Sequence, residues 1–329
     1  MADDQARQRL RSIFVSSSCF DACMRPARIL ESYSVMMVLG LVLGLLTGGL
    51  PAYTKEASMA SLAVLMTLSL STVSLVEARG KEHVRHSIWS LVLNYGILTG
   101  VILAISLFFE GEYRWGWILM AAAPSAVSVV PFTTILGGKT SKALFSTALN
   151  YIVALAIMPA MTLALIGSAV STSSLVTSLL ILIVLPMVAS RLVMRLEISK
   201  PVNTSMMNIC FTLMIFAVTG ANRDAFIGEP TVMIAISAAC AIRTFGTGLG
   251  AEYLLRKAKM QKEERTAYVL FASYKNLGLT ATLAIALFEP AVAVPATICI
   301  VFEVVWVIFL LRYYPRVPGQ ILPATKSTT

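Results

Sequence analysis

Charged residues are scarce in this chain. Only 13% of its 329 residues are Asp, Glu, Lys or Arg, whereas 57% are hydrophobic; an average soluble domain has about 25% charged residues. So little charge cannot cover the apolar surface in water, which excludes a soluble globular domain and makes the lipid bilayer the expected surroundings. The 26 basic residues outnumber the 17 acidic ones. They stand in short segments between apolar runs, which indicates membrane topology and not nucleic-acid binding.

Motifs of soluble enzymes are also missing. There is no G-x-x-x-x-G-K-[S/T] loop, which excludes ATP-driven pumping by this chain alone, and no G-x-S-x-G or H-E-x-x-H. The five cysteines are scattered, and the nearest pair, Cys19 and Cys23, has no partners at zinc-binding spacing. We therefore expect no enzyme activity, no cofactor, no metal site and no disulfide.

Ten apolar runs are present instead, each near the roughly 20 residues that cross a hydrocarbon core of about 30 Å. They are 33–52, 57–77, 87–109, 115–136, 142–168, 173–194, 203–221, 230–254, 266–288 and 291–311. With the N-terminus inside, the outer loops hold only Lys55, Arg114 and Arg223, the spans hold Arg243 and Lys275, and all other basic residues fall on the inner side. This alternation predicts ten transmembrane helices with both termini cytoplasmic.

Ten helices divide into two five-helix halves of opposite orientation, 31–168 and 169–313. A basic segment, 1–30, precedes them and a tail, 314–329, follows. The basic segment has no long apolar centre, so it does not read as a signal peptide. A helix on the inner leaflet and a disordered basic tail are both open. Inverted repeats of this kind are typical of secondary transporters, which bind substrate at the midplane where broken helices meet.

The fourth and ninth runs are each interrupted at the same depth. "APSAVSVVP" (123–131) places a proline at each end of a serine-containing stretch, and "ASYKNLG" (272–278) places polar residues inside an apolar run. Pro124 and Lys275 each stand about nine residues, or roughly 13 Å, from the start of their run, near the bilayer centre. Exposed backbone is too costly in lipid, so both breaks are predicted to face a protein-enclosed cavity. An ordinary proline kink is the alternative.

These stretches carry a resemblance to the bile acid:sodium symporter superfamily. "APSAVSVVPFTTILGGKTSKALFSTALNYIVALAIMP" is similar to its fourth and fifth helices, and "YKNLGLTATLAIALFEPAVAVPA" to its ninth. Elsewhere the resemblance rests on topology. It implies an all-α fold of ten helices in a panel domain and a core domain, with helices four and nine crossing, and a role in carrying organic anions.

The resemblance also implies a sodium site, from which this chain departs. In sodium-coupled members the ions are held by a Ser-Asn pair of helix four, hydroxyls of helix five, and a Glu and the Gln of a Gln-Asn pair in helix nine. Here Val129 replaces the first Asn, Lys275 replaces the Gln, and Phe271 or a neighbour replaces the Glu, since no acid lies between Arg265 and Glu289. The matching positions are Ser128, Thr147 and Asn276.

Compared with the sodium-coupled members, this site therefore lacks the Glu carboxylate and gains the ammonium of Lys275. We expect the ammonium of Lys275 to stand where relatives bind sodium, so that transport does not need sodium. A buried lysine can also exchange its proton, which leaves coupling to protons open. The alternative for Lys275 is snorkelling to an interface, which its depth opposes.

Two further charges, Arg243 and Glu303, lie inside predicted spans, where charges are expensive and typically functional. The alternative to a functional role is that Arg243 and Glu303 form purely structural ion pairs, with each other or with Lys275. The three charges sum to +1, which favours an anionic, carboxylate-bearing solute. The residues predicted to bind or gate it are Ser125, Ser128, Thr147, Asn150, Ser273, Lys275 and Asn276, with Arg243 and Glu303 as a supporting charge network. For Asn94, Asn150 and Asn208 an interhelical hydrogen bond is equally compatible.

The sequence therefore predicts a secondary active transporter for a small or amphipathic organic anion, monomeric or weakly oligomeric, that works by alternating access. A sodium-coupled symporter and an uncoupled facilitator are the alternatives within transport. A channel usually repeats a short filter in an oligomer, and an intramembrane enzyme needs a catalytic group beside Glu303, where the sequence offers no histidine.

Overall fold

The computed structural model describes residues 26–72, 81–167, 171–196 and 198–314, and every regular element within them is a helix. Most of the predicted basic segment, including Cys19 and Cys23, and all but Tyr314 of the predicted tail lie outside the described residues.

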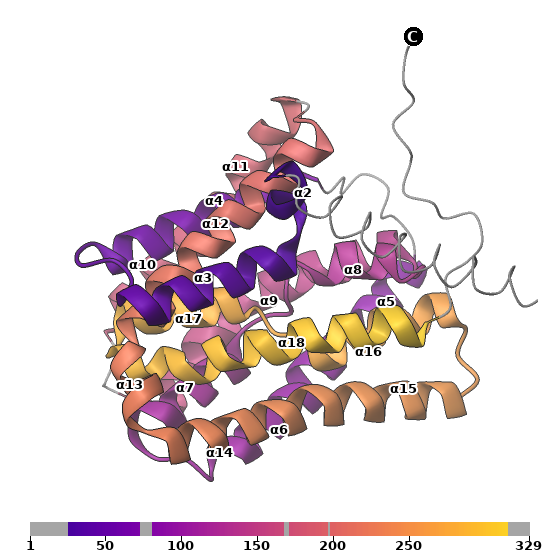
Figure 1. The fold of residues 1–329 in the computed structure, drawn as a ribbon. Helices are drawn as coiled ribbons and strands as arrows, with labels where there is room; N and C mark the ends of the chain where they lie inside the picture. The colour runs from indigo at the N-terminus through magenta and orange to yellow at the C-terminus, as the bar shows by residue number, and fades with distance from the viewer. Residues whose placement is uncertain (1–25, 73–80, 168–170, 197, 315–329) are drawn as a thin grey trace, which may run out of the picture.

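The helices follow one another along the whole described chain (Figure 1). In order they are α2 (Pro26–Glu31), α3 (Tyr33–Thr47), α4 (Thr54–Ser71), α5 (Lys81–Leu91), η2 (Val92–Leu98), α6 (Thr99–Ser106), α7 (Gly111–Ala122), α8 (Val129–Ile135), α9 (Thr140–Leu165), α10 (Thr172–Leu179), η4 (Leu180–Val184), α11 (Leu185–Val193), η5 (Met194–Leu196), α12 (Lys200–Ala221), α13 (Arg223–Gly228), α14 (Pro230–Ala241), η6 (Ile242–Gly246), α15 (Thr247–Lys257), α16 (Lys262–Ser273), α17 (Leu277–Leu287), η7 (Pro290–Ala293) and α18 (Val294–Tyr313). The elements η2, η4 and η6 are π-helical turns inside longer helices.

Seven helical segments among the described residues are long and apolar enough to cross a membrane. They are His83–Ser106, Thr140–Leu165, Thr172–Leu196, Lys200–Ala221, Pro230–Lys257, Lys262–Leu287 and Pro290–Tyr313, and each overlaps one predicted span. The other three predicted spans fall on α3, which has only 15 residues, on α4, which begins with the polar sequence Thr-Lys-Glu, and on α7 and α8, which are separate helices. The chain is therefore a multi-pass membrane protein.

The helices pack in two groups. In the first, α12 lies against both α3 and α4, and α11 lies against α4; this group forms the upper part of Figure 1. In the second, α7, α9, α14, α16, α17 and α18 pack around one another, with α5 against α9. The segment Lys262–Leu287 lies deep inside the protein, since 94% of its most apolar stretch is buried, against 28% for Thr140–Leu165. Its second half, α17, also packs against α4 and α12 of the first group.

Small residues let α3 and α12 approach closely. A Cβ on Gly220 would collide with the backbone of Gly48 and Gly49, and a Cβ on Gly40 would stand 2.7 Å from the carbonyl oxygen of Thr212. The Thr212 hydroxyl also donates a hydrogen bond to the Met36 carbonyl, at 3.0 Å. Glycine at such contacts is the usual device for close helix packing in membranes.

Gly220→Ala is expected to lower the thermal unfolding temperature of the purified protein. The added methyl group meets backbone that cannot move aside, and overpacking of this kind costs about 1–3 kcal/mol. Gly250→Ala is the matched control, since a Cβ there has no neighbour within 4 Å. Equal unfolding temperatures for the two variants would contradict the close contact between α3 and α12.

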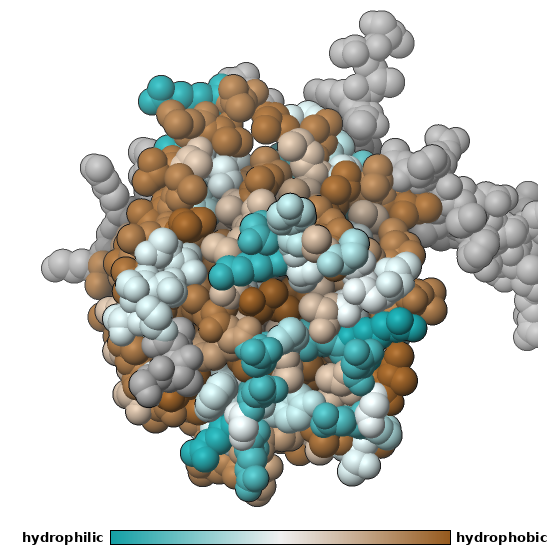
Figure 2. All heavy atoms as spheres, turned by 90° about the vertical axis from the view of Figure 1, so that its left-hand side faces the viewer, coloured by the Kyte–Doolittle hydropathy of each residue, from teal (hydrophilic) through white to brown (hydrophobic). Residues whose placement is uncertain are grey.

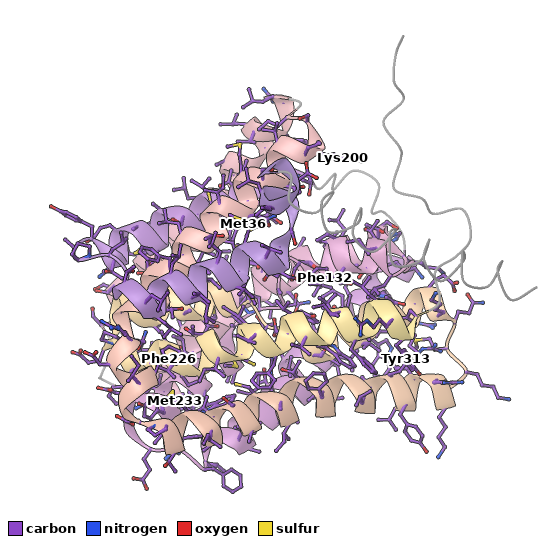
Figure 3. The ribbon with its side chains drawn as sticks, in the orientation of Figure 1. Met36, Phe132, Lys200, Phe226, Met233 and Tyr313 are labelled. Carbon is purple, nitrogen blue, oxygen red and sulfur yellow. The ribbon has the colours of Figure 1, made fainter. Side chains whose placement is uncertain are left out.

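At one end of the molecule, polar residues gather across the middle and lower part, with apolar residues above them (Figure 2). This is the left-hand end of Figure 1, where α13 lies. Phe226 of α13 and Met233 of α14 mark this end in Figure 3, and Tyr313 of α18 marks the opposite one. The polar residues here include exposed Lys55, Arg223, Asp224, Glu229 and Glu289. A membrane-spanning body exposes polar residues of this kind where it meets water.

Candidate functional site

Both predicted helix breaks are present. The first lies between α7, which ends at Ala122, and α8, which begins at Val129; the second lies between α16, which ends at Ser273, and α17, which begins at Leu277. Pro124 has no backbone N–H to continue α7. Asn276 ends the second break by capping α17, because its side-chain oxygen accepts a hydrogen bond from the Leu279 N–H at 3.0 Å. Both breaks therefore have local chemical causes.

The two breaks touch each other. The backbone N–H of Asn276 donates to the carbonyl oxygen of Pro124 at 2.7 Å. Residues 124 and 276 are far apart in the sequence, and this bond joins two irregular segments that would otherwise each expose unpaired backbone. We call the meeting of residues 123–128 with residues 274–276 the junction.

Lys275 is completely buried at the junction, and its ammonium group is surrounded by oxygen atoms. The ammonium nitrogen lies 3.0 Å from Asn94 Oδ1, 3.0 Å from Thr99 Oγ1, 3.0 Å from the Ala121 carbonyl oxygen and 2.8 Å from the Ala123 carbonyl oxygen. The two carbonyls belong to the end of α7, where a helix carries partial negative charge. The lysine nitrogen is thus surrounded by neutral oxygen acceptors, which are suitable partners for an ammonium group.

The neighbouring residues fix the orientation of this lysine. The ring of Tyr95 lies 4.6 Å from the ammonium, close enough for a cation–π interaction. The amide nitrogen of Asn94 donates to the carbonyl oxygens of Phe271 and Tyr274, at 3.3 and 3.2 Å. Asn94 therefore connects the lysine to the end of α16. It lies in the π-helical turn η2, and such turns often occur at functional sites.

Arg243 and Glu303 pair with each other, as one predicted alternative states. Arg243 Nη1 lies 2.6 Å from Glu303 Oε1, and that oxygen also accepts from the backbone N–H of Lys275 at 3.1 Å. The Tyr274 hydroxyl donates to the Glu303 carbonyl. The ion pair is thus attached directly to the second break, while the Lys275 ammonium binds elsewhere.

Ser273 and Asn276 are also held at the junction. Trp306 Nε1 donates to Ser273 Oγ at 3.0 Å, and Asn276 Nδ2 donates to the Tyr151 hydroxyl. Ser125 is buried, and its hydroxyl has no hydrogen-bond partner among the described residues. Ser128 stands immediately before α8, and its carbonyl accepts from Phe132 N at 3.0 Å.

The α9 residues lie further from Lys275. Asn150 Nδ2 donates to the Ser146 carbonyl at 2.8 Å and to Ser90 Oγ at 3.3 Å, and the Asn150 carbonyl accepts from the Tyr95 hydroxyl. The structure therefore gives Asn150 an interhelical hydrogen bond with Ser90, and its carbonyl is connected to Lys275 through Tyr95.

Thr147 lines a small cavity of about 30 Å³ between α4 and α11 on one side and α8 and α9 on the other. The cavity lies where the two helix groups meet, and its walls are mostly apolar. Its polar members are Thr147, Tyr151 and Arg191. Val127 of the junction lines the cavity directly, and Tyr151, another lining residue, accepts a hydrogen bond from Asn276.

Sequence reasoning missed most of the ligands of Lys275. Two of them are backbone carbonyls, which carry no residue signature, and Thr99 and Tyr95 are ordinary residues in an apolar run. Asn94 did carry a signal, because it is a polar residue inside a span. No group of three or more His, Cys, Asp or Glu side chains that could hold a metal occurs within residues 26–72, 81–167, 171–196 and 198–314.

Comparison with known protein families places the chain in a transporter family. The model of the SBF-like CPA transporter family (DUF4137) matches residues 35–310. The matched range contains every residue of the junction, the Arg243–Glu303 pair and the small cavity. No curated protein matches the chain.

Proposed function

Because the chain belongs to the SBF-like CPA transporter family, we propose that it is a secondary transporter that carries a small or amphipathic organic anion. The family match supports transport and, with the apolar helices, an integral membrane location. It also makes an enzyme a poor description of the chain. The junction of the two broken helices is the site around which alternating access would occur.

Ten spans arranged as two inverted repeats are part of this proposal. Two pairs of features support the arrangement. The breaks in α7–α8 and α16–α17 correspond, and so do the π-helical turns η2 and η6, which carry Asn94 and Arg243. In each half the π turn precedes the break, and its polar residue reaches the second break: Asn94 through two carbonyls, and Arg243 through Glu303. With this arrangement both termini are cytoplasmic, and the repeats are 31–168 and 169–313.

In this proposal the ammonium group of Lys275 replaces a bound sodium ion. The observation that carries it is the set of four neutral oxygens within 3.0 Å of a fully buried ammonium. Oxygen ligands of this kind suit a sodium ion equally well, so the tethered ammonium makes a mobile one unnecessary. Sodium-independent transport follows, and proton exchange on Lys275 is the route by which coupling to protons would arise.

An anionic substrate suits the charge of the site. Lys275, Arg243 and Glu303 together carry +1, and a helix end is already used to balance Lys275. The small cavity beside Thr147 lies between the two helix groups, with Arg191 among its lining residues. At about 30 Å³ it has room for little more than a water molecule, so in this proposal it marks where the two groups would separate and is not a formed substrate pocket.

The uptake experiment uses the full-length protein in proteoliposomes. A panel of carboxylates is first screened for a rise in unfolding temperature, with and without sodium. The most stabilising carboxylate is then used as the labelled solute in sodium-free and sodium-containing media. We expect equal uptake in both media and accelerated exchange against unlabelled solute inside. Strict sodium dependence would favour the sodium-coupled alternative, and the absence of counterflow would favour a channel.

A further inference from the structure

Arg243 carries hydrogen-bond donors that the described part of the chain leaves without partners. Its side chain is 0% exposed, yet neither Nε nor Nη2 has a hydrogen-bond partner among the described residues. Buried charged groups are normally paired and hydrogen-bonded, because the loss of water is otherwise uncompensated. An arginine with two open donors at a fully buried position therefore points to a ligand.

The open donors form one edge of the guanidinium. Nη1, at the other end, is fully used by Glu303 Oε1 at 2.6 Å, Thr244 Oγ1 at 3.3 Å and Cys299 Sγ at 3.4 Å. Nε–H and Nη2–H point in parallel from the opposite side. This is the edge that binds a carboxylate through two parallel hydrogen bonds.

Local structure aims this edge. Arg243 lies in the π-helical turn η6 (Ile242–Gly246), where the helix is widened by one residue. Glu303, on α18, holds the same guanidinium and the backbone of Lys275 through one oxygen. The Glu303 carboxylate therefore both holds Arg243, whose other edge is open, and contacts the second break.

We propose that the Nε–Nη2 edge of Arg243 binds the carboxylate of the substrate. Glu303 is then the internal counter-charge, and its protonation is linked to this binding. This inference rests on the proposed function as an anion carrier. A substrate carboxylate on Arg243 and an ionised Glu303 repel each other across one guanidinium. Protonation of Glu303 removes that repulsion, and by linkage a bound carboxylate favours a protonated Glu303 to the same extent.

Glu303 is better placed than Arg243 to exchange a proton. Its side chain keeps 9% of its surface exposed, whereas that of Arg243 keeps none. The titratable and charged groups that face it are Tyr33 from α3, Cys240 from α14, Arg243 from η6, Tyr274 and Lys275 from the second break, and Cys299 from α18. Glu303 is the only carboxylate of this set.

The test uses the purified full-length protein and acetate as the probe, with acetamide as the neutral isostere. Unfolding temperature is measured against acetate concentration at about pH 6 and about pH 8.5. We expect a saturable rise with acetate alone, with half-saturation at least about threefold lower at the acidic pH. Glu303→Gln should bind acetate at least about tenfold more tightly than wild type at the alkaline pH and lose the pH dependence. Arg243→Lys, which keeps the charge but lacks the two-donor edge, should abolish saturation.

Arg223→Lys, the same substitution at an exposed site, is the control and should leave the titration unchanged. Saturable binding that is identical in wild type and Arg243→Lys would overturn the proposal, and so would weaker binding by Glu303→Gln. If Arg243→Lys does not fold, the comparison of Glu303→Gln with wild type decides. If acetate does not bind but sodium-independent uptake is intact, this inference alone is refuted. If no anion is taken up at all, the proposed function is refuted.

Discussion

Lys275→Ala is expected to reduce uptake by at least about 100-fold. The substitution removes the ammonium from four oxygen ligands at the junction. A hydrogen bond to a charged group contributes about 1.5–3 kcal/mol, and each 1.4 kcal/mol or so is a factor of ten. Loss of two such bonds is therefore enough for the expected effect. The measurement is initial uptake by proteoliposomes with matched protein content.

A chemical rescue separates the role of the charge from the role of the side-chain volume. Lys275→Ala leaves the oxygen ligands and a space, so methylammonium in the assay buffer should restore part of the lost uptake. Lys275→Met fills that space with an apolar chain and should not be rescued. Lys200→Ala removes a lysine from an exposed position at the start of α12 (Figure 3) and should behave as wild type. Normal uptake by Lys275→Met would remove the ammonium from the mechanism.

Glu303→Ala is expected to lower the free energy of unfolding by about 3–5 kcal/mol, because it leaves the buried Arg243 guanidinium without its counter-charge. The same change also removes the acceptor for the backbone N–H of Lys275. Replacing both members of the pair, as in Arg243→Met with Glu303→Met, should restore most of the loss, since apolar pairs of similar volume often replace buried ion pairs without cost. Denaturant unfolding in detergent measures all three proteins.

The control for this series is Glu229→Ala. Glu229 accepts a hydrogen bond from Tyr113 at an exposed position, so its removal should change stability by no more than about 0.5 kcal/mol. If Glu303→Ala and Glu229→Ala were equally mild, the Arg243–Glu303 pair would not be desolvated as the structure has it.

The helix breaks were predictable because their causes are local. A proline at position 124 and polar residues at 275 and 276 interrupt apolar periodicity wherever the rest of the chain lies. Their equal depth follows from counting residues. The contact between them, from Asn276 N to the Pro124 carbonyl, involves only backbone atoms. No residue pattern specifies such a bond, and it was reachable from the sequence only through the expectation that broken backbone must be paired.

The neighbourhood of Lys275 was less predictable. The sequence indicated a buried cation but not which oxygens would bind it, because Ala121 and Ala123 contribute carbonyls and Thr99 comes from another span. The pairing of Arg243 with Glu303 was one of the alternatives, and only tertiary packing selects among them. Thr147, expected near the substrate from the family resemblance, lies beside the small cavity. Asn150 makes the interhelical hydrogen bond that was the alternative to substrate contact.

Binding of radioactive sodium to the purified wild-type protein tests most directly whether a tethered ammonium has taken the place of a mobile ion. We predict no saturable sodium binding by the wild type at any concentration that saturates ordinary transporter sites, because the Lys275 ammonium already occupies the oxygen ligands at the junction. Saturable, stoichiometric sodium binding by a wild-type protein that still carries Lys275 would contradict the account.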